Sequence, residues 1–290
     1  MNLLKKLMCS AAFALGATGT AIASPILTNW VFNPTGGGFS SGQTVGEYLD
    51  INGNAFIQLT PTGGTSFAFK ETAVFNIVQA DSNGRLFPVN FPGGNITATF
   101  EAMGSGNYGG AFTFSDGTIR MYQNPVNNQY AGTSGYYGAN LGNLIAEFDV
   151  LAGGGGRVDS SGAPLNNGQV SLFAKAAPGM LDAGYFFNSA GQDLSSRSIL
   201  GFAFTNANTL AHPSTTLVSE LACQYAGFTA GGCTAGTYSN RPNEYFFIGA
   251  NGQFKLGQVN EVPEPGSLAL FGIALLAAGA GARKRQQLRK

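Results

Sequence analysis

The sequence predicts an all-β fold, an antiparallel β-sandwich or jelly roll with one short helix, between two segments that direct export. Glycine provides 43 of the 290 residues, and glycine weakens helices and favours turns. Short segments in which apolar and polar residues alternate recur along the chain, and this is the period of a half-buried strand. Both ends combine an apolar run with basic residues. Residues 24–260 are therefore expected to form one β domain, preceded by residues 1–23 and followed by residues 261–290.

The first 23 residues are typical of a secretory signal peptide. Lys5 and Lys6 give a positively charged start, the apolar stretch 7–17 follows, and a small-residue cleavage site ends at Ala23. Signal peptidase is expected to cut there and leave Ser24 as the new N-terminus. The domain that follows is therefore expected to be exported.

Eleven segments of the middle region have the composition of strands, because they are rich in aromatic or β-branched residues and end at Gly, Asn or Pro. In one of them, Ile96, Ala98 and Phe100 face one way and the polar residues between them face the other, as in a half-buried antiparallel strand. Short strands at this density indicate two packed sheets. The segments are 55–60, 66–79, 96–102, 111–114, 118–122, 144–151, 169–174, 185–188, 201–205, 245–248 and 253–256.

The clearest predicted hairpin covers residues 111–122. Asp116 and Gly117 lie between its two alternating halves, and both residue types tolerate the positive φ that a tight turn requires. A turn is therefore expected at Asp116-Gly117.

Residues 214–226 are the one segment that favours a helix. Ser214 or Thr215 is a suitable N-cap, and Gly227 follows as a C-terminal stop. Apolar residues recur between them at helical spacing, at Leu217, Leu221 and Tyr225. A helix of about three turns is expected.

Two cysteines, Cys223 and Cys233, remain after removal of both ends. Because exported proteins meet an oxidising environment, a disulfide between them is expected. Two free buried thiols are the alternative, whereas a metal pair lacks a nearby histidine.

The charge balance changes when both ends are removed. The whole chain has 15 basic and 15 acidic side chains, but seven of the basic ones lie near the termini, so residues 24–265 keep eight basic and 15 acidic side chains. An acidic domain without a basic patch is a poor nucleic-acid binder. Long runs of Gly, Asn, Ser and Thr suit contact with hydrated neutral polymers.

The sequence offers little catalytic machinery, so we expect a non-enzymatic protein without a cofactor or metal. A catalytic triad or zinc site normally needs more than the single histidine, His212. Residues 153–156 are four glycines followed by Arg157, which excludes a phosphate loop and suggests a flexible one. Glu147 and Asp149 share one face of a predicted strand and could form a glycosidase pair, although solvent-facing carboxylates are commoner.

Two further patterns concern binding. Residues 50–54 and 81–84 place Asp and Asn at alternate positions, as calcium loops do, but the first lacks the glycine and glutamate expected downstream. Asx-turns are the simpler interpretation. Four tyrosines among Gly, Asn and Gln could stack on sugar rings or cover an edge of the core: Tyr108, Tyr130, Tyr136 and Tyr137.

The C-terminal end combines a short polar motif, an apolar run and basic residues. The motif is Val262-Pro263-Glu264-Pro265, whose prolines prevent a helix from running through it. The apolar run 267–282 has sixteen residues, whereas an ordinary spanning helix needs ~20. Arg283-Lys284-Arg285 follows and is expected to hold the C-terminus in the cytoplasm. A plain membrane anchor is one interpretation of such a segment.

In its residues and their order, this end resembles the PEP-CTERM sorting signal of exported proteins in Gram-negative bacteria that make exopolysaccharide. The resemblance implies that residues 261–290 are a sorting signal with a transmembrane helix. It implies that a membrane-embedded exosortase recognises the Val262–Pro265 motif, cuts near it, and releases the upstream domain to the cell envelope or matrix. The protein would thus be anchored only transiently in the inner membrane.

A second resemblance is spread over residues 29–38, 119–125 and 246–254, which look like flocculation-associated PEP-CTERM proteins of floc-forming bacteria. It implies a non-enzymatic role in which the protein retains exopolysaccharide in floc or biofilm formation, and it supplies no catalytic residues. An extracellular polysaccharide-binding lectin or hydrolase with the same sorting signal is the alternative.

Overall fold

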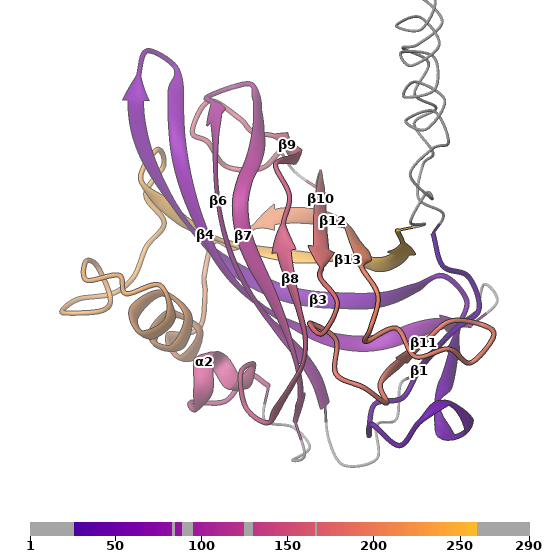
Figure 1. The fold of residues 1–290 in the computed structure, drawn as a ribbon. Coiled ribbons are helices and arrows are strands. Elements are labelled where there is room, and N and C mark those ends of the chain that lie inside the picture. Colours follow the sequence, from indigo (N-terminus) through magenta and orange to yellow (C-terminus); the bar gives the residue numbers. More distant parts are fainter. Residues whose placement is uncertain (1–25, 83–84, 89–94, 125–129, 166, 260–290) are drawn as a thin grey trace, which may run out of the picture. The chain divides into compact units, whose positions relative to one another are not determined.

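The computed structural model describes residues 26–82, 85–88, 95–124, 130–165 and 167–259 (Figure 1). The chain divides after Gln258 into two units, and every helix and strand described belongs to the first. The predicted signal peptide 1–23, the predicted Ala23–Ser24 cleavage site and the C-terminal segment 261–290 lie outside the described residues. Among the residues that are described, no helix is long and apolar enough to cross a membrane.

Eight antiparallel strands form one sheet that closes on itself (Figure 1). Each strand pairs with the next in the order β3, β4, β6, β7, β8, β10, β12 and β13, and β13 pairs with β3. The bounds are β3 Tyr48–Gly63, β4 Ser66–Ser82, β6 Asn95–Asn107, β7 Ala111–Asn124, β8 Asn143–Val150, β10 Gly168–Ala176, β12 Ile199–Thr209 and β13 Tyr245–Gln258. A ninth strand, β9 (Gly153–Arg157), pairs with β7 and β10 beside β8.

The prediction of an all-β, antiparallel fold is therefore confirmed. The predicted arrangement of two packed sheets, a sandwich or jelly roll, is wrong. Opposite walls of one barrel take the place of two packed sheets, and the ladder between β10 and β12, from Gly168–Ala207 to Ala176–Ile199, completes the closure. Apolar and polar residues alternate in the same way in a sandwich and in a barrel. The alternation alone therefore did not distinguish the two.

Two glycine-containing segments are strands where turns or loops were predicted. Asp116 and Gly117 lie inside β7, opposite Met103 and Ala102, at a register shift that marks a β-bulge. The actual turn between β6 and β7 is at residues 108–110. The four glycines 153–156 form most of β9, and a Cβ at Gly155 would lie 1.9 Å from the carbonyl oxygen of Phe112. Glycine there permits the close approach of two backbones.

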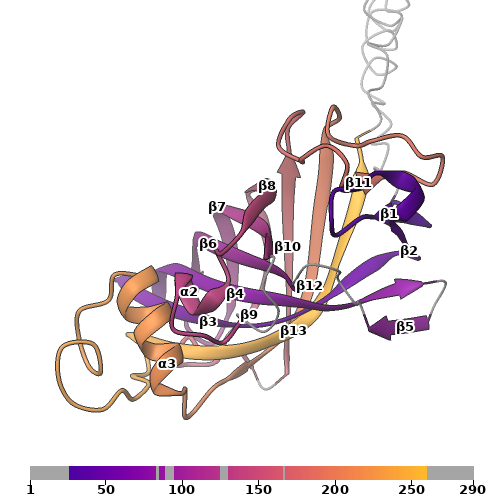
Figure 2. The same cartoon turned by 90° about the horizontal axis from the view of Figure 1, so that it is seen from below.

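The predicted helix is confirmed. It comprises α3 (Thr215–Leu217) and a π-helical continuation, η2 (Val218–Tyr225), and the Ser214 hydroxyl caps it by accepting a hydrogen bond from the Leu217 N–H at 3.2 Å. The helix packs on the outer face of β3 and β4 (Figure 2), where Leu217 and Leu221 join a buried cluster with Phe56 and Val74. It stabilises the barrel wall from outside.

The remaining elements are short. A separate three-stranded sheet orders β11 (Phe186–Phe187), β1 (Trp30–Phe32) and β2 (Gln43–Val45). The others are β5 (Arg85–Pro88), which pairs with β4, a 3₁₀ turn η1 (Phe39–Ser41), and α2 (Gly135–Gly138). The larger apolar cluster lines the barrel interior and extends to Trp30 and Phe186 of the small sheet.

The sulfur atoms of Cys223 and Cys233 are bonded, with their Cα atoms 5.4 Å apart. The disulfide joins the last turns of the π-helix to the loop that follows. It closes a loop over a sequence separation of ten residues, and such a loop restricts the unfolded chain.

We expect the double variant Cys223→Ser/Cys233→Ser to lose ~2–3 kcal/mol of unfolding free energy, because its unfolded chain gains the freedom that the disulfide removes. Urea denaturation of the exported protein measures this loss. Reductant should destabilise the natural protein by a similar amount and leave the double variant unchanged. An equal effect of reductant on both proteins would contradict a stabilising disulfide.

Candidate functional site

A row of amide side chains crosses the outer face of the barrel at one register level. Each member lies directly opposite the next on the adjacent strand. Adjacent strands lie ~4.8 Å apart, so the amides follow one another at that interval across five strands. In the order β10, β12, β13, β3 and β4, this amide row consists of Gln169, Asn206, Asn251, Asn52 and Asn76.

The amide row faces outward because the residues beside it in the sequence face inward. Ile51, Thr205 and Ala250 line the barrel interior, and each directly precedes a member of the row. Four members are exposed, and Asn76 is half-buried. None of the five amides forms a hydrogen bond with another residue in the part of the chain that the structure describes. Their donors and acceptors are free to bind a ligand.

The next register level adds an aromatic ring and another amide. It aligns Ser171, Phe204, Gln253 and Asp50 on the same four strands, β10, β12, β13 and β3. The Phe204 side chain is 37% exposed, which is unusual for phenylalanine in a strand and leaves a ring face available for stacking. A shallow hollow of about 470 Å³ lies over the two levels.

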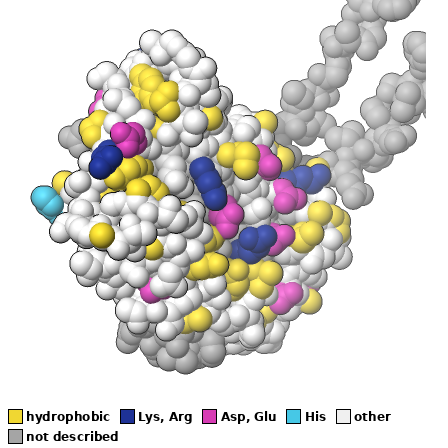
Figure 3. Space-filling view, turned by 90° about the vertical axis from the view of Figure 1, so that its left-hand side faces the viewer, with side chains coloured by type: hydrophobic (Ala, Val, Ile, Leu, Met, Phe, Trp, Pro, Cys, Tyr) yellow, Lys and Arg dark blue, Asp and Glu magenta, His cyan; other side chains and the backbone are white. Residues whose placement is uncertain are grey.

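The hollow carries little charge. Asp50 is the single charged side chain that lines it within the described residues. One level further along, the ammonium group of Lys255 pairs with Glu47 at 2.7 Å and lies 5.6 Å from the Tyr48 ring. On the face shown in Figure 3, charged side chains are likewise few, and Lys or Arg lie next to Asp or Glu. The surface therefore suits neutral, hydroxyl-rich ligands better than ions.

The tyrosines predicted as possible stacking platforms pack against their neighbours. Tyr136 stacks on Tyr225 with centroids 4.1 Å apart, and Tyr130 contacts Tyr137 edge to face. The Tyr130 hydroxyl donates to the Val74 carbonyl, and burial raises the pKa of this phenol. Tyr108 likewise contacts Phe67, with centroids 4.8 Å apart. All four cover edges of the core, as the alternative interpretation held.

The carboxylates singled out in the sequence do not converge on one site. Glu147 accepts a hydrogen bond from Arg120 Nε at 2.6 Å and is held in that ion pair, while Asp149 is exposed. Asp50 lies on the β3 strand, so the Asx-turn interpretation is wrong for residues 50–54. In the described ranges, no three His, Cys, Asp or Glu residues are grouped as metal ligands would be. His212 lies exposed in the bend before α3.

Sequence reasoning missed the amide row, although part of its signal is visible. Asn occupies the polar positions of the alternation at 52, 206 and 251, where Thr or charged residues are more usual in strands. Their alignment depends on which strands pair and in which register. That information is not local to any one strand.

The comparisons with known proteins concern the C-terminus. Residues 261–286 match the family model described as the PEP-CTERM protein-sorting motif, and this range includes Val262–Pro265 and Arg283–Arg285. No curated protein and no solved structure matches the chain. The motif implies export, transient anchoring in a membrane and processing by an exosortase. The chain is a PEP-CTERM domain-containing protein.

Proposed function

We propose that the barrel is released by exosortase at the surface of a Gram-negative bacterium and acts there as a non-enzymatic protein of the envelope or matrix. In this role it associates with exopolysaccharide during floc or biofilm formation. The sorting motif supports the export route. The amide row is the single observation that carries the polysaccharide part of the proposal.

The chemistry of the row suits a neutral glycan. A carboxamide both donates and accepts hydrogen bonds, as sugar hydroxyls do, and a row of five offers these groups at the ~4.8 Å interval of the strands. This interval is similar to the length of one sugar residue in an extended chain. Phe204, beside the row, can stack on a sugar ring. Because individual neutral hydrogen bonds contribute only ~0.5–1.5 kcal/mol each, retention depends on many contacts along one polymer.

A polysaccharide hydrolase or a sugar-specific lectin with the same sorting signal is the second candidate. The Arg120 ion pair occupies the Glu147 carboxylate, which is an observation against its use as a free glycosidase acid. Incubation of the exported protein with host exopolysaccharide separates the candidates. New reducing ends indicate a hydrolase, retention without cleavage indicates a binder, and competition by one monosaccharide indicates a lectin.

The double variant Pro263→Ala/Pro265→Ala should accumulate as an uncut, membrane-associated form, because alanine at both positions would allow a helix to run through the motif. Intact mass spectrometry of secreted and membrane fractions detects the uncut form. The neighbouring change Glu261→Gln is the matched control and should be processed normally. Release of the double variant at the natural mass would exclude recognition of these prolines.

The triple variant Asn52→Ala/Asn206→Ala/Asn251→Ala should lose about tenfold or more in affinity for the exopolysaccharide, because three hydrogen-bonding groups are removed. Co-sedimentation with the purified polymer measures this loss. Gln58→Ala, on the same face of β3 but six residues from Asn52, should bind normally and controls for general changes of the surface.

The same triple variant should also fail to restore aggregation in a strain that lacks the gene but still makes the polysaccharide. Unchanged binding by a correctly folded triple variant would contradict the proposed surface. Normal flocs in the deletion strain would contradict the proposed biological role.

A further inference from the structure

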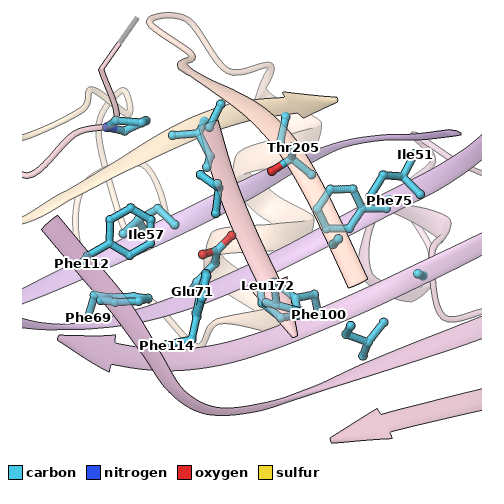
Figure 4. Close-up of a pocket in the computed structure, with 18 of the residues that line it drawn as sticks. Ile51, Ile57, Phe69, Glu71, Phe75, Phe100, Phe112, Phe114, Leu172 and Thr205 are labelled. Carbon is cyan, nitrogen blue, oxygen red and sulfur yellow. The ribbon is translucent and has the colours of Figure 1, made fainter. Parts of the chain in front are cut away.

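The barrel interior contains a cavity of about 110 Å³ (Figure 4). Side chains of seven barrel strands line it, and nearly all of them are apolar. Protein interiors are normally packed with few voids larger than a water molecule, and one water needs only ~10–15 Å³ measured in this way. The interior therefore has room for a small molecule.

Glu71 is the exception to the apolar lining. It lies on β4 between the inward-facing residues Phe69 and Ala73, and Figure 4 shows its carboxyl group pointing into the cavity. The side chain retains some accessible surface, and that surface faces the cavity. Within the described part of the chain, the carboxyl group has neither a hydrogen-bond donor nor a cation as partner.

This placement is unfavourable for folding alone. A buried carboxyl without a partner loses its hydration and gains nothing in return. Burial raises the pKa of Glu71 to about 7, and no other titratable side chain lines the cavity among the described residues. An apolar residue of similar size would fill the space and remove the penalty. The carboxyl group is explained if a ligand supplies the missing partner.

The loop between β9 and β10 forms part of the cavity wall. Val158, Gly162 and Pro164 of this loop contribute to the lining. Asp159 organises the loop, since its carboxylate accepts hydrogen bonds from the Ser161 hydroxyl and from two backbone N–H groups. The loop therefore contributes an ordered segment to the mostly apolar lining, in which a polar contact is stronger than in water.

We propose that the barrel cavity binds a small hydrophobic amine, whose apolar part contacts the aromatic and aliphatic lining and whose ammonium group pairs with the carboxylate of Glu71. Thr205, the other polar side chain in the lining, offers a second hydrogen-bond acceptor. The site lies inside the barrel and the amide row lies outside it. The inference is therefore independent of polysaccharide binding.

Calorimetric titration of the exported protein with butylamine, butanol and butyrate at pH 8 tests the proposal. Butylamine should bind about tenfold or more tightly than butanol, because only the ammonium forms a charge-assisted pair, and butyrate should not bind. Glu71→Gln should abolish the preference for the amine and retain weak butanol binding. Equal affinity for amine and alcohol, no amine binding, or an unchanged preference in Glu71→Gln would overturn the proposal.

Two further measurements distinguish a loss of ligand binding from a loss of folding. Ala203→Leu fills part of the cavity from β12, leaves Glu71 unchanged, and should weaken the binding of butylamine and butanol alike. Because the folded pKa of Glu71 exceeds its unfolded value, the ligand-free protein should lose stability as pH rises from ~4.5 to ~7. Relative to the natural protein, Glu71→Gln should show a smaller fall of the thermal midpoint over this range. A Glu71→Gln midpoint that falls just as much would show that the carboxyl is not the unpaired group described, and would also overturn the proposal.

Discussion

The ladder between β10 and β12 closes the sheet, and both the interior and the outer surface depend on this closure. Nine residue pairs join the two strands, and β12 continues the sheet through eleven pairs to β13. Without this ladder, β10 and β12 would be edge strands with unpaired backbone groups, and edges of this length favour association with other chains. Closure removes both edges at once and separates the barrel interior from the outer surface.

The helix α3–η2 packs on the outer surface of the barrel wall, and the disulfide joins this helix to the loop that follows it. Phe56, Val74 and Phe247 project outward from β3, β4 and β13, and without a cover they would expose a large apolar patch. The helix covers them, and the Cys223–Cys233 bond holds the following loop against it. Among the described residues, no helix covers the neighbouring outer face of β10 and β12, and the amide row is accessible there.

Local patterns predicted the strands and the helix well, but they did not predict what depends on pairing. The Ser214 cap and the inward direction of Ile96, Ala98 and Phe100 act within one element, and both were predicted correctly. The strand is not half-buried as predicted, because Thr97 and Thr99 on its other face are buried as well. The turn predicted at Asp116-Gly117 is wrong because residues that tolerate unusual backbone geometry occur in β-bulges as well as in turns. The glycines 153–156 were misread because their role, the close approach of Gly155 to Phe112, involves a distant strand. Three features could not be predicted from local patterns: the closure of the barrel, the amide row and the position of Glu71. To predict them, one must know which strands pair and in which register, and these strands lie far apart in the sequence.

The same strand register places the amide row on the outer face of the barrel and the cavity lining on the inner face. Ile51 and Asn52, Thr205 and Asn206, and Ala250 and Asn251 are consecutive pairs in which the first residue faces the cavity and the second faces solvent. A slip of one residue in any of these strands would exchange the two faces. It would bury an amide without a partner and expose an apolar side chain, and both changes cost free energy. The same polar residues that offer hydrogen bonds to a ligand therefore also fix the pairing that aligns them.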